Sequence, residues 1–106
     1  MVKQLSVREL SERLKTNQPG VILDVREPWE TSVASLPGTL NIPMGEITQR
    51  SNELPDDQDI IVLCHHGIRS QQVAYYLNNL GFENLYNLSG GIAAWSRDVD
   101  PNTPVY

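Results

Sequence analysis

The chain has 106 residues, 40% of them hydrophobic and 20% charged, and its formal net charge is −5 at pH 7. This length fits one compact domain over residues 1–106. The acidic balance excludes a chain-wide basic surface for nucleic acid, although a small local anion site remains compatible with it.

The first residues, MVKQLSVREL, predict a short edge strand at KQLS and no secretory signal. Ser6 and Glu9 have the spacing of a capping box, and Val7, Leu10 and Leu14 fall on one helical face, which predicts a helix directly after Ser6. No apolar run anywhere in the chain approaches the ~20 residues needed to span a bilayer, so no membrane association is expected.

The next segments alternate between strands and helices. Residues 20–25, GVILDV, form a continuous apolar run that is typical of a buried parallel strand. Proline suits the first turn of a helix, so Pro28 predicts a short helix through residue 34. A turn and a short strand over 40–42 follow, and residues 44–54 are expected to form one helix that Pro55 stops.

The second half repeats this alternation. Residues 59–64, DIIVLC, predict a second buried strand, and the helical spacing after it ends at Gly81, which suits a left-handed C-cap. The apolar positions of that helix are Val73, Ala74, Leu77 and Leu80. A third apolar strand is expected at 84–88, and SGGIAAWSR predicts a last short helix. The pattern indicates an α/β fold with a parallel-rich sheet and helices on both faces, in which ligands bind at the carboxyl ends of strands.

The single cysteine, Cys64, excludes an intramolecular disulfide, and it stands at the carboxyl end of a predicted strand, within LCHHGIRSQ. Gly67 allows the backbone to curl its N–H groups toward the sulfur, Arg69 adds positive charge, and His65 and His66 can add partial charge. These features favour a thiolate, which is the nucleophilic form. A lone cysteine is most often a small buried hydrophobe, but this polar loop favours a reactive one. Adjacent residues diverge and only three candidate ligands exist, so no metal or other cofactor is expected.

A thiolate in an anion-binding loop suits either phosphate-ester hydrolysis or sulfane-sulfur transfer. Cysteine-dependent phosphatases resemble one another in having five residues between cysteine and arginine, whereas Cys64 and Arg69 enclose four. The tighter loop is better matched to a single sulfur atom. Arsenate reduction with an external thiol and a non-catalytic regulatory module of the same fold remain alternatives.

Three segments in order and at similar spacing resemble the single-domain rhodaneses, which are sulfurtransferases: ILDVREPWE, LPGTLNIP and the stretch from IVLCHHGIRS to GGIAAW. The resemblance implies a central five-stranded, mainly parallel sheet. It also implies a ping-pong reaction in which Cys64 takes the outer sulfur of a donor such as thiosulfate and a thiophilic acceptor removes it. The acceptor would be cyanide or a small or protein thiol.

The resemblance assigns the persulfide-binding loop to His65, His66, Gly67, Ile68, Arg69 and Ser70. Their backbone N–H groups would stabilise the persulfide, Arg69 would steer or hold the anionic donor, and Ser70 would cap the helix or donate a hydrogen bond to the anion-binding loop. No second cysteine exists, so the sulfur must leave to another molecule. A monomer is expected.

Outside the loop, Asp24 and Arg26 match the family's DVR element. A structural role is favoured for both: Asp24 ends a buried strand, and Arg26 pairs with an acid or caps a loop. Arg26 is the stronger candidate to line the site. Gly90 and Gly91 are expected to permit close backbone approach near the pocket. Trp95 is expected in the core and Trp29 in packing or at the rim, and Ser35 stands where family members often carry a histidine.

Overall fold

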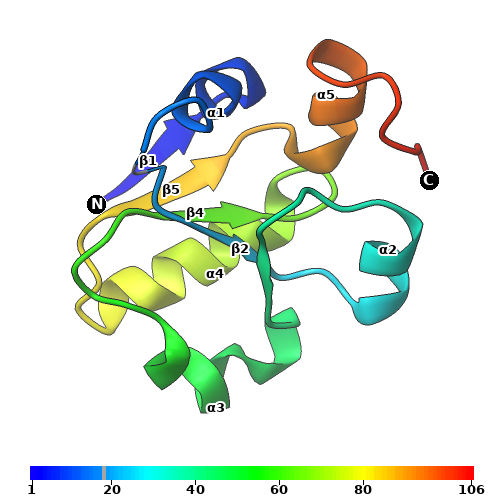
Figure 1. Cartoon of the computed structure of the whole chain (residues 1–106). Coiled ribbons are helices and arrows are strands. Elements are labelled where there is room, and N and C mark those ends of the chain that lie inside the picture. Colours follow the sequence, from blue (N-terminus) through cyan, green and yellow to red (C-terminus); the bar gives the residue numbers. More distant parts are fainter. Residues whose placement is uncertain (18) are drawn as a thin grey trace.

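The computed structural model describes residues 1–17 and 19–106, whose strands join in one parallel sheet (Figure 1). The strands are β1 (Val2–Leu5), β2 (Val21–Asp24), β3 (Leu40–Asn41), β4 (Ile60–Leu63) and β5 (Leu85–Leu88). Their order across the sheet is β1-β5-β4-β2-β3, and each described pairing is parallel. The predicted α/β class and the five-stranded sheet are therefore confirmed.

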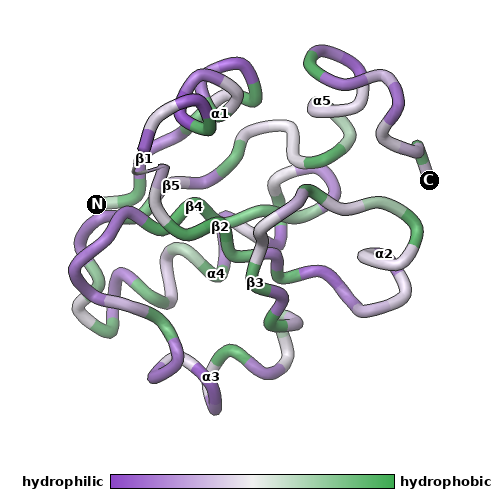
Figure 2. Tube along the Cα trace, viewed as in Figure 1, coloured by the Kyte–Doolittle hydropathy of each residue, from purple (hydrophilic) through white to green (hydrophobic). Residues whose placement is uncertain are grey.

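Helices cover both faces of this sheet. They are α1 (Val7–Arg13), α2 (Pro28–Val33), α3 (Ile47–Arg50), α4 (Ile68–Asn79) and α5 (Gly91–Asp98). In Figure 1, α1 and α5 lie on one side of the sheet and α3 and α4 on the other. Two apolar cores result, one on each side, and Figure 2 shows the hydrophobic colour concentrated along the central strands β2 and β4.

The central strand β4 divides its side chains between the two cores. Ile61 and Leu63 belong to the core beneath α1 and α5, whereas Ile60, Val62 and Cys64 belong to the core beneath α3 and α4. All four residues of β4 are buried because sheet neighbours flank it and helices cover it above and below. The alternation of a strand thus directs the Cys64 side chain toward α4.

Two local signals in the sequence correctly mark helix ends. The Ser6 hydroxyl accepts from the Glu9 backbone N–H while the Glu9 carboxylate accepts from the Ser6 N–H, which is the predicted capping box. Gly81, with φ +106°, follows α4 in the left-handed conformation. Leu14 and Leu80, the last apolar positions of the two spacing patterns, are the C-cap residues of α1 and α4 and are 37% and 50% exposed.

The single helix predicted over 44–54 is also wrong. The segment consists of a 3₁₀ turn at Met44–Glu46, the one-turn helix α3 and a second 3₁₀ turn at Ser51–Glu53. Only Ile47 and Leu54 of this segment are buried, so packing does not require one continuous apolar face. Within residues 1–17 and 19–106, no helix has both the length and the apolar character to cross a bilayer.

Candidate active site

Cys64 follows β4 directly, at the carboxyl end of the strand, and its side chain lies inside a curled loop. The backbone N–H groups of Gly67 and Ser70 both donate to Sγ, at 3.1 and 3.4 Å, and the Ser70 hydroxyl lies 3.3 Å from the sulfur. The residue is only 1% exposed. Since α4 begins at Ile68, its positive N-terminal end is also directed at this loop. The arrangement is a preformed cradle for negative charge on sulfur.

Two glycines make the curl possible. Gly67 has φ +102°, a backbone conformation that other residues rarely adopt, and it precedes the first turn of α4. Gly91 begins α5, and a Cβ there would lie 2.4 Å from the carbonyl oxygens of both Cys64 and His65. The close approach expected of Gly91 is thereby confirmed.

The same contact gives the N-terminus of α5 its hydrogen-bond partners. The N–H groups of Ile92 and Ala93 donate to the carbonyls of Cys64 and His65, at 3.0 and 3.1 Å. Free N–H groups in the first turn of a helix need acceptors from outside the helix, and the loop supplies them. The loop that holds the sulfur is thus fixed from behind by α5.

One of the two predicted roles of Ser70, that of capping α4, is wrong. The cap position is Gly67, and Ser70 lies in the first turn with its hydroxyl between Sγ and Asn87. The Asn87 amide N–H groups donate to the Gly67 carbonyl and to Gln4, so its carbonyl oxygen accepts the Ser70 proton. Because a hydroxyl carries one proton, the Ser70 oxygen is then free to accept from the Cys64 thiol.

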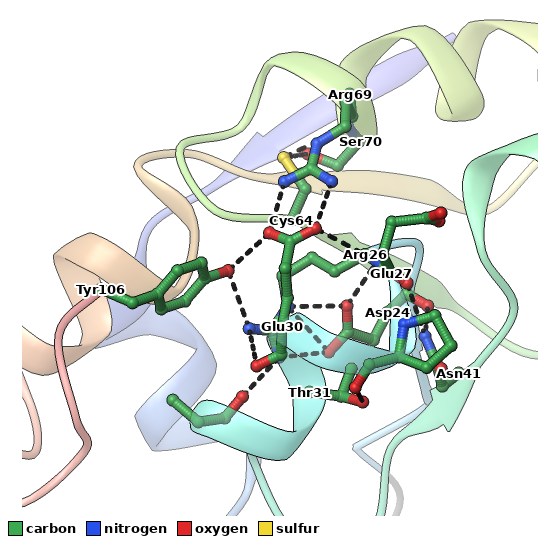
Figure 3. Close-up of polar contacts among 12 residues, drawn as sticks. Asp24, Arg26, Glu27, Glu30, Thr31, Asn41, Cys64, Arg69, Ser70 and Tyr106 are labelled. Carbon is green, nitrogen blue, oxygen red and sulfur yellow. Dashed lines mark hydrogen bonds and ion pairs between the residues drawn. The ribbon is translucent and has the colours of Figure 1, made fainter.

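Arg69 does not stand free beside the sulfur (Figure 3). Its guanidinium donates to both carboxylate oxygens of Glu30, at 2.6 and 2.8 Å, in a bidentate pair between α4 and α2. The bonds from Arg69 lower the pKa of Glu30 to about 2, against the opposing effect of burial and with further help from Tyr106. The same pairing raises the pKa of Arg69, and the nearby Cys64 raises it further.

Asp24 and Arg26 form a second ion pair beneath this one, and both are fully buried. The Arg26 guanidinium donates to the Asp24 carboxylate, to the backbone carbonyls of Glu30 and Ala34, and to the Tyr106 hydroxyl. Arg26 therefore ties the α2 segment to β2 and reaches the site through Tyr106. Ser35, which follows Ala34, is exposed.

The two loop histidines stack on each other, and His65 also stacks on Tyr106. The ring centroids are 4.0 Å apart in both pairs, with interplanar angles of 29° and 10°. Burial is the main cause that lowers the pKa of His65, and the neighbouring His66 lowers it further. His65 thus carries less positive charge than an ordinary histidine, contrary to the charge expected from its place in the loop.

Of the predicted loop residues, Gly67 and Ser70 contact Sγ, whereas Arg69 pairs with Glu30 and the two histidines stack on each other. Ile68 is 70% exposed. Trp95 is a core residue, as predicted, and Trp29 lies at the surface, 62% exposed, with its ring edge-on to Tyr106.

Three residues of the site were missed by sequence reasoning: Glu30, Asn87 and Tyr106. Glu30 stands inside the quoted DVREPWE segment, and Asn87 is a polar residue within an apolar strand, so each gave a signal that could have been followed. Tyr106 gave none.

The fold and site together define a class: a small α/β protein whose parallel strand ends in a cysteine held by backbone N–H groups. The chain belongs to the rhodanese-like domain family, which it matches over residues 6–98. It is 37% identical to a sulfurtransferase of Allochromatium vinosum over 97 residues, which cover 92% of this chain and 91% of that protein. At the level of the family, the protein is a sulfurtransferase.

A solved structure gives the same fold. The rhodanese-like domain protein from Staphylococcus aureus superimposes with a TM-score of 0.85 at 30% identity, covering 98% of each chain. The chain is also 38% identical, over 112 residues, to the chloroplastic rhodanese-like/PpiC domain-containing protein 12 of Arabidopsis thaliana. That match covers 99% of this chain but only 38% of the longer plant protein.

Proposed function

We propose that the protein transfers a sulfane sulfur from an anionic donor such as thiosulfate to a thiophilic acceptor, with Cys64 as the carrier. The observation that carries this proposal is the convergence of the Gly67 and Ser70 N–H groups on Sγ. Fixed N–H dipoles stabilise a negative sulfur without any reorganisation during the reaction. The short spacing from Cys64 to Arg69 adds support, since it leaves a loop sized for one sulfur atom.

In the first half-reaction, the Cys64 thiolate attacks the outer sulfur of thiosulfate. A bond forms between Sγ and that sulfur, the sulfur–sulfur bond of thiosulfate breaks, and sulfite leaves with the electron pair. In the second half-reaction, cyanide or a thiolate attacks the outer sulfur, and the Cys64 thiolate is regenerated. Covalent catalysis divides one difficult transfer into two easier ones.

Arg69 is the donor's partner in this proposal, and Glu30 is an internal anion that occupies Arg69 in the resting state. Two charge-assisted hydrogen bonds join them, so a donor must displace the Glu30 carboxylate or share the guanidinium with it. A carboxylate beside the site also repels a divalent anion. Glu30 therefore sets how much donor is needed.

The acceptor side is proposed as a small or protein-borne thiol, or cyanide in the test tube. We also propose the cytoplasm as the location, because a thiol that must be free to react is maintained in reducing compartments. No cofactor is needed for either half-reaction.

The test is mass spectrometry of the intact protein after incubation with thiosulfate. We expect the mass of one additional sulfur atom, its loss on adding cyanide, and no adduct in Cys64→Ser. Absence of the adduct together with turnover of an aryl phosphate would overturn the proposal and favour a cysteine-dependent phosphatase.

A further inference from the structure

The segment after α5 reaches the site although it lies outside the part of the chain that matches the family. The match ends at residue 98, and residues 99–106 continue past it. The N–H groups of Val99 and Asp100 both donate to the Trp95 carbonyl at 2.9 Å, and the Thr103 N–H donates to the Asp100 carbonyl at 3.0 Å. These bonds fold the segment against the domain and direct its last side chain, Tyr106, toward the site (Figure 3).

Tyr106 is held there by its hydroxyl and by its ring. The hydroxyl donates to the Glu30 carboxylate at 2.7 Å and accepts from the Arg26 guanidinium at 3.0 Å. The ring lies parallel to His65 with a centroid separation of 4.0 Å, and the Trp29 ring meets it edge-on at 5.8 Å. The ring thus cannot leave without breaking two hydrogen bonds to charged groups and separating from two aromatic neighbours.

The position matters because Cys64 is almost completely covered. The curled loop covers Sγ through Gly67 and Ser70, and β4 lies behind it. On the α2 side, hydrogen bonds join Arg69, Glu30 and Tyr106 into a continuous belt of side chains, and the Arg69 end of this belt lies beside Cys64 (Figure 3). Of the backbone loop and the belt, the belt is the part that can move while the backbone cradle stays intact.

We propose that Tyr106 is a specificity-determining residue, which holds the belt closed and restricts Cys64 to small reaction partners. Opening the belt requires the hydroxyl to release Glu30 and the ring to leave His65. Small donors and acceptors need little of this movement, whereas a thiol carried on a large molecule needs much more. The part of the inference that concerns sulfur donors and acceptors rests on the proposed function. The part that concerns access of reagents to the Cys64 thiol does not depend on that function.

The experiment compares two reagents with one reactive group: N-ethylmaleimide and a maleimide attached to a long polyethylene glycol chain. Their rates of reaction with Cys64 are measured in the wild type, Tyr106→Ala, Tyr106→Phe and the control Tyr75→Ala. Tyr75 lies on α4 and is 54% exposed, so its loss leaves both rates unchanged. Loss of hydrogen bonds to charged groups should raise the bulky-to-small rate ratio about tenfold in Tyr106→Ala. Tyr106→Phe, which keeps the ring, should give a smaller rise.

An unchanged ratio of the two rates in Tyr106→Ala would overturn the inference. Failure of both reagents to react with this variant would overturn it as well. So would an equal rise in both rates, because that result indicates general loosening. If Tyr106→Ala does not fold, the ratio in Tyr106→Phe decides by the same criterion. Persulfide formation from thiosulfate is measured separately on the same proteins. A raised ratio of maleimide rates without any persulfide would reject the proposed function and support the role of Tyr106. Persulfide formation with an unchanged ratio would support the proposed function and reject the role of Tyr106.

Discussion

Replacing Glu30 with glutamine tests whether the anion subsite is occupied by the protein itself. Glu30 is 3% exposed and binds Arg69 through both carboxylate oxygens. Glutamine keeps nearly the same size and one acceptor oxygen, but it removes the charge and turns the other position into a donor. Arg69 is then available to an external anion, and the repulsion between Glu30 and that anion disappears.

The size of the effect follows from the exposure of the pair. The Arg69 side chain is 33% exposed and the Glu30 side chain 4%, so the pair lies between the surface and the interior. Exposed ion pairs contribute about 0–1 kcal/mol, and hydrogen bonds to charged groups about 1.5–3 kcal/mol. An intermediate value of about 1.4 kcal/mol corresponds to a tenfold change in affinity. We therefore expect Glu30→Gln to lower the thiosulfate concentration for half-maximal persulfide formation about tenfold.

The assay is the first half-reaction alone, followed by intact mass over a range of thiosulfate concentrations. Arg69→Ala should weaken donor use more than persulfide delivery to a neutral thiol. In the Arg69→Ala background, Glu30→Gln should lower the donor requirement less than it does in the wild type, because only the repulsion is then removed and no guanidinium is released. An increased donor requirement in Glu30→Gln would refute the competition and indicate that Glu30 positions Arg69. An unchanged one would show that Arg69 does not contact the donor.

Two further predictions concern stability. Gly91→Ala should destabilise the protein by more than ~2 kcal/mol in chemical denaturation, because φ is +59° and the new Cβ meets two carbonyls, whereas Gly45→Ala, with open space around it, should stay within ~0.5 kcal/mol. The pKa of Glu30, about 2 instead of 4.5, means that its ion pair stabilises the fold above pH 4.5 and that this stability is lost as the pH falls toward 2. Melting curves of Glu30→Gln should lose part of that acid sensitivity; an identical pH profile would contradict the assignment.

The sequence predicted the fold best where a signal lies within one element. The Ser6–Glu9 capping box depends on residues three apart, and Gly81 marks a helix end by its own backbone freedom. The prediction of one helix over residues 44–54 was wrong because little tertiary packing holds this segment in a single helix. Only two of its side chains are buried, so local turns compete successfully with a helix.

The site divides in the same way. The cradle around Cys64 is continuous in sequence, so its curl could be predicted from Gly67 and the helix that follows. The partners of the loop come from elsewhere in the chain: Glu30 from α2, Asn87 from β5 and Tyr106 from the last residues. The motif around Glu30 marks it as a candidate, but its pairing with Arg69 depends on where the fold places α2 relative to the start of α4.

The distribution of charge around the sulfur favours a singly charged sulfur species over a phosphoryl group. The two arginines near the site are each paired with a carboxylate, Arg26 with Asp24 and Arg69 with Glu30. The lowered pKa of His65 removes a further source of positive charge. What remains directed at Sγ is the pair of backbone N–H groups and the N-terminal end of α4. These partial charges match the single negative charge of a persulfide intermediate. A phospho-cysteine intermediate would carry about two negative charges and would have to draw Arg69 away from Glu30 for its whole lifetime, whereas a dianionic sulfur donor does so only while it is bound.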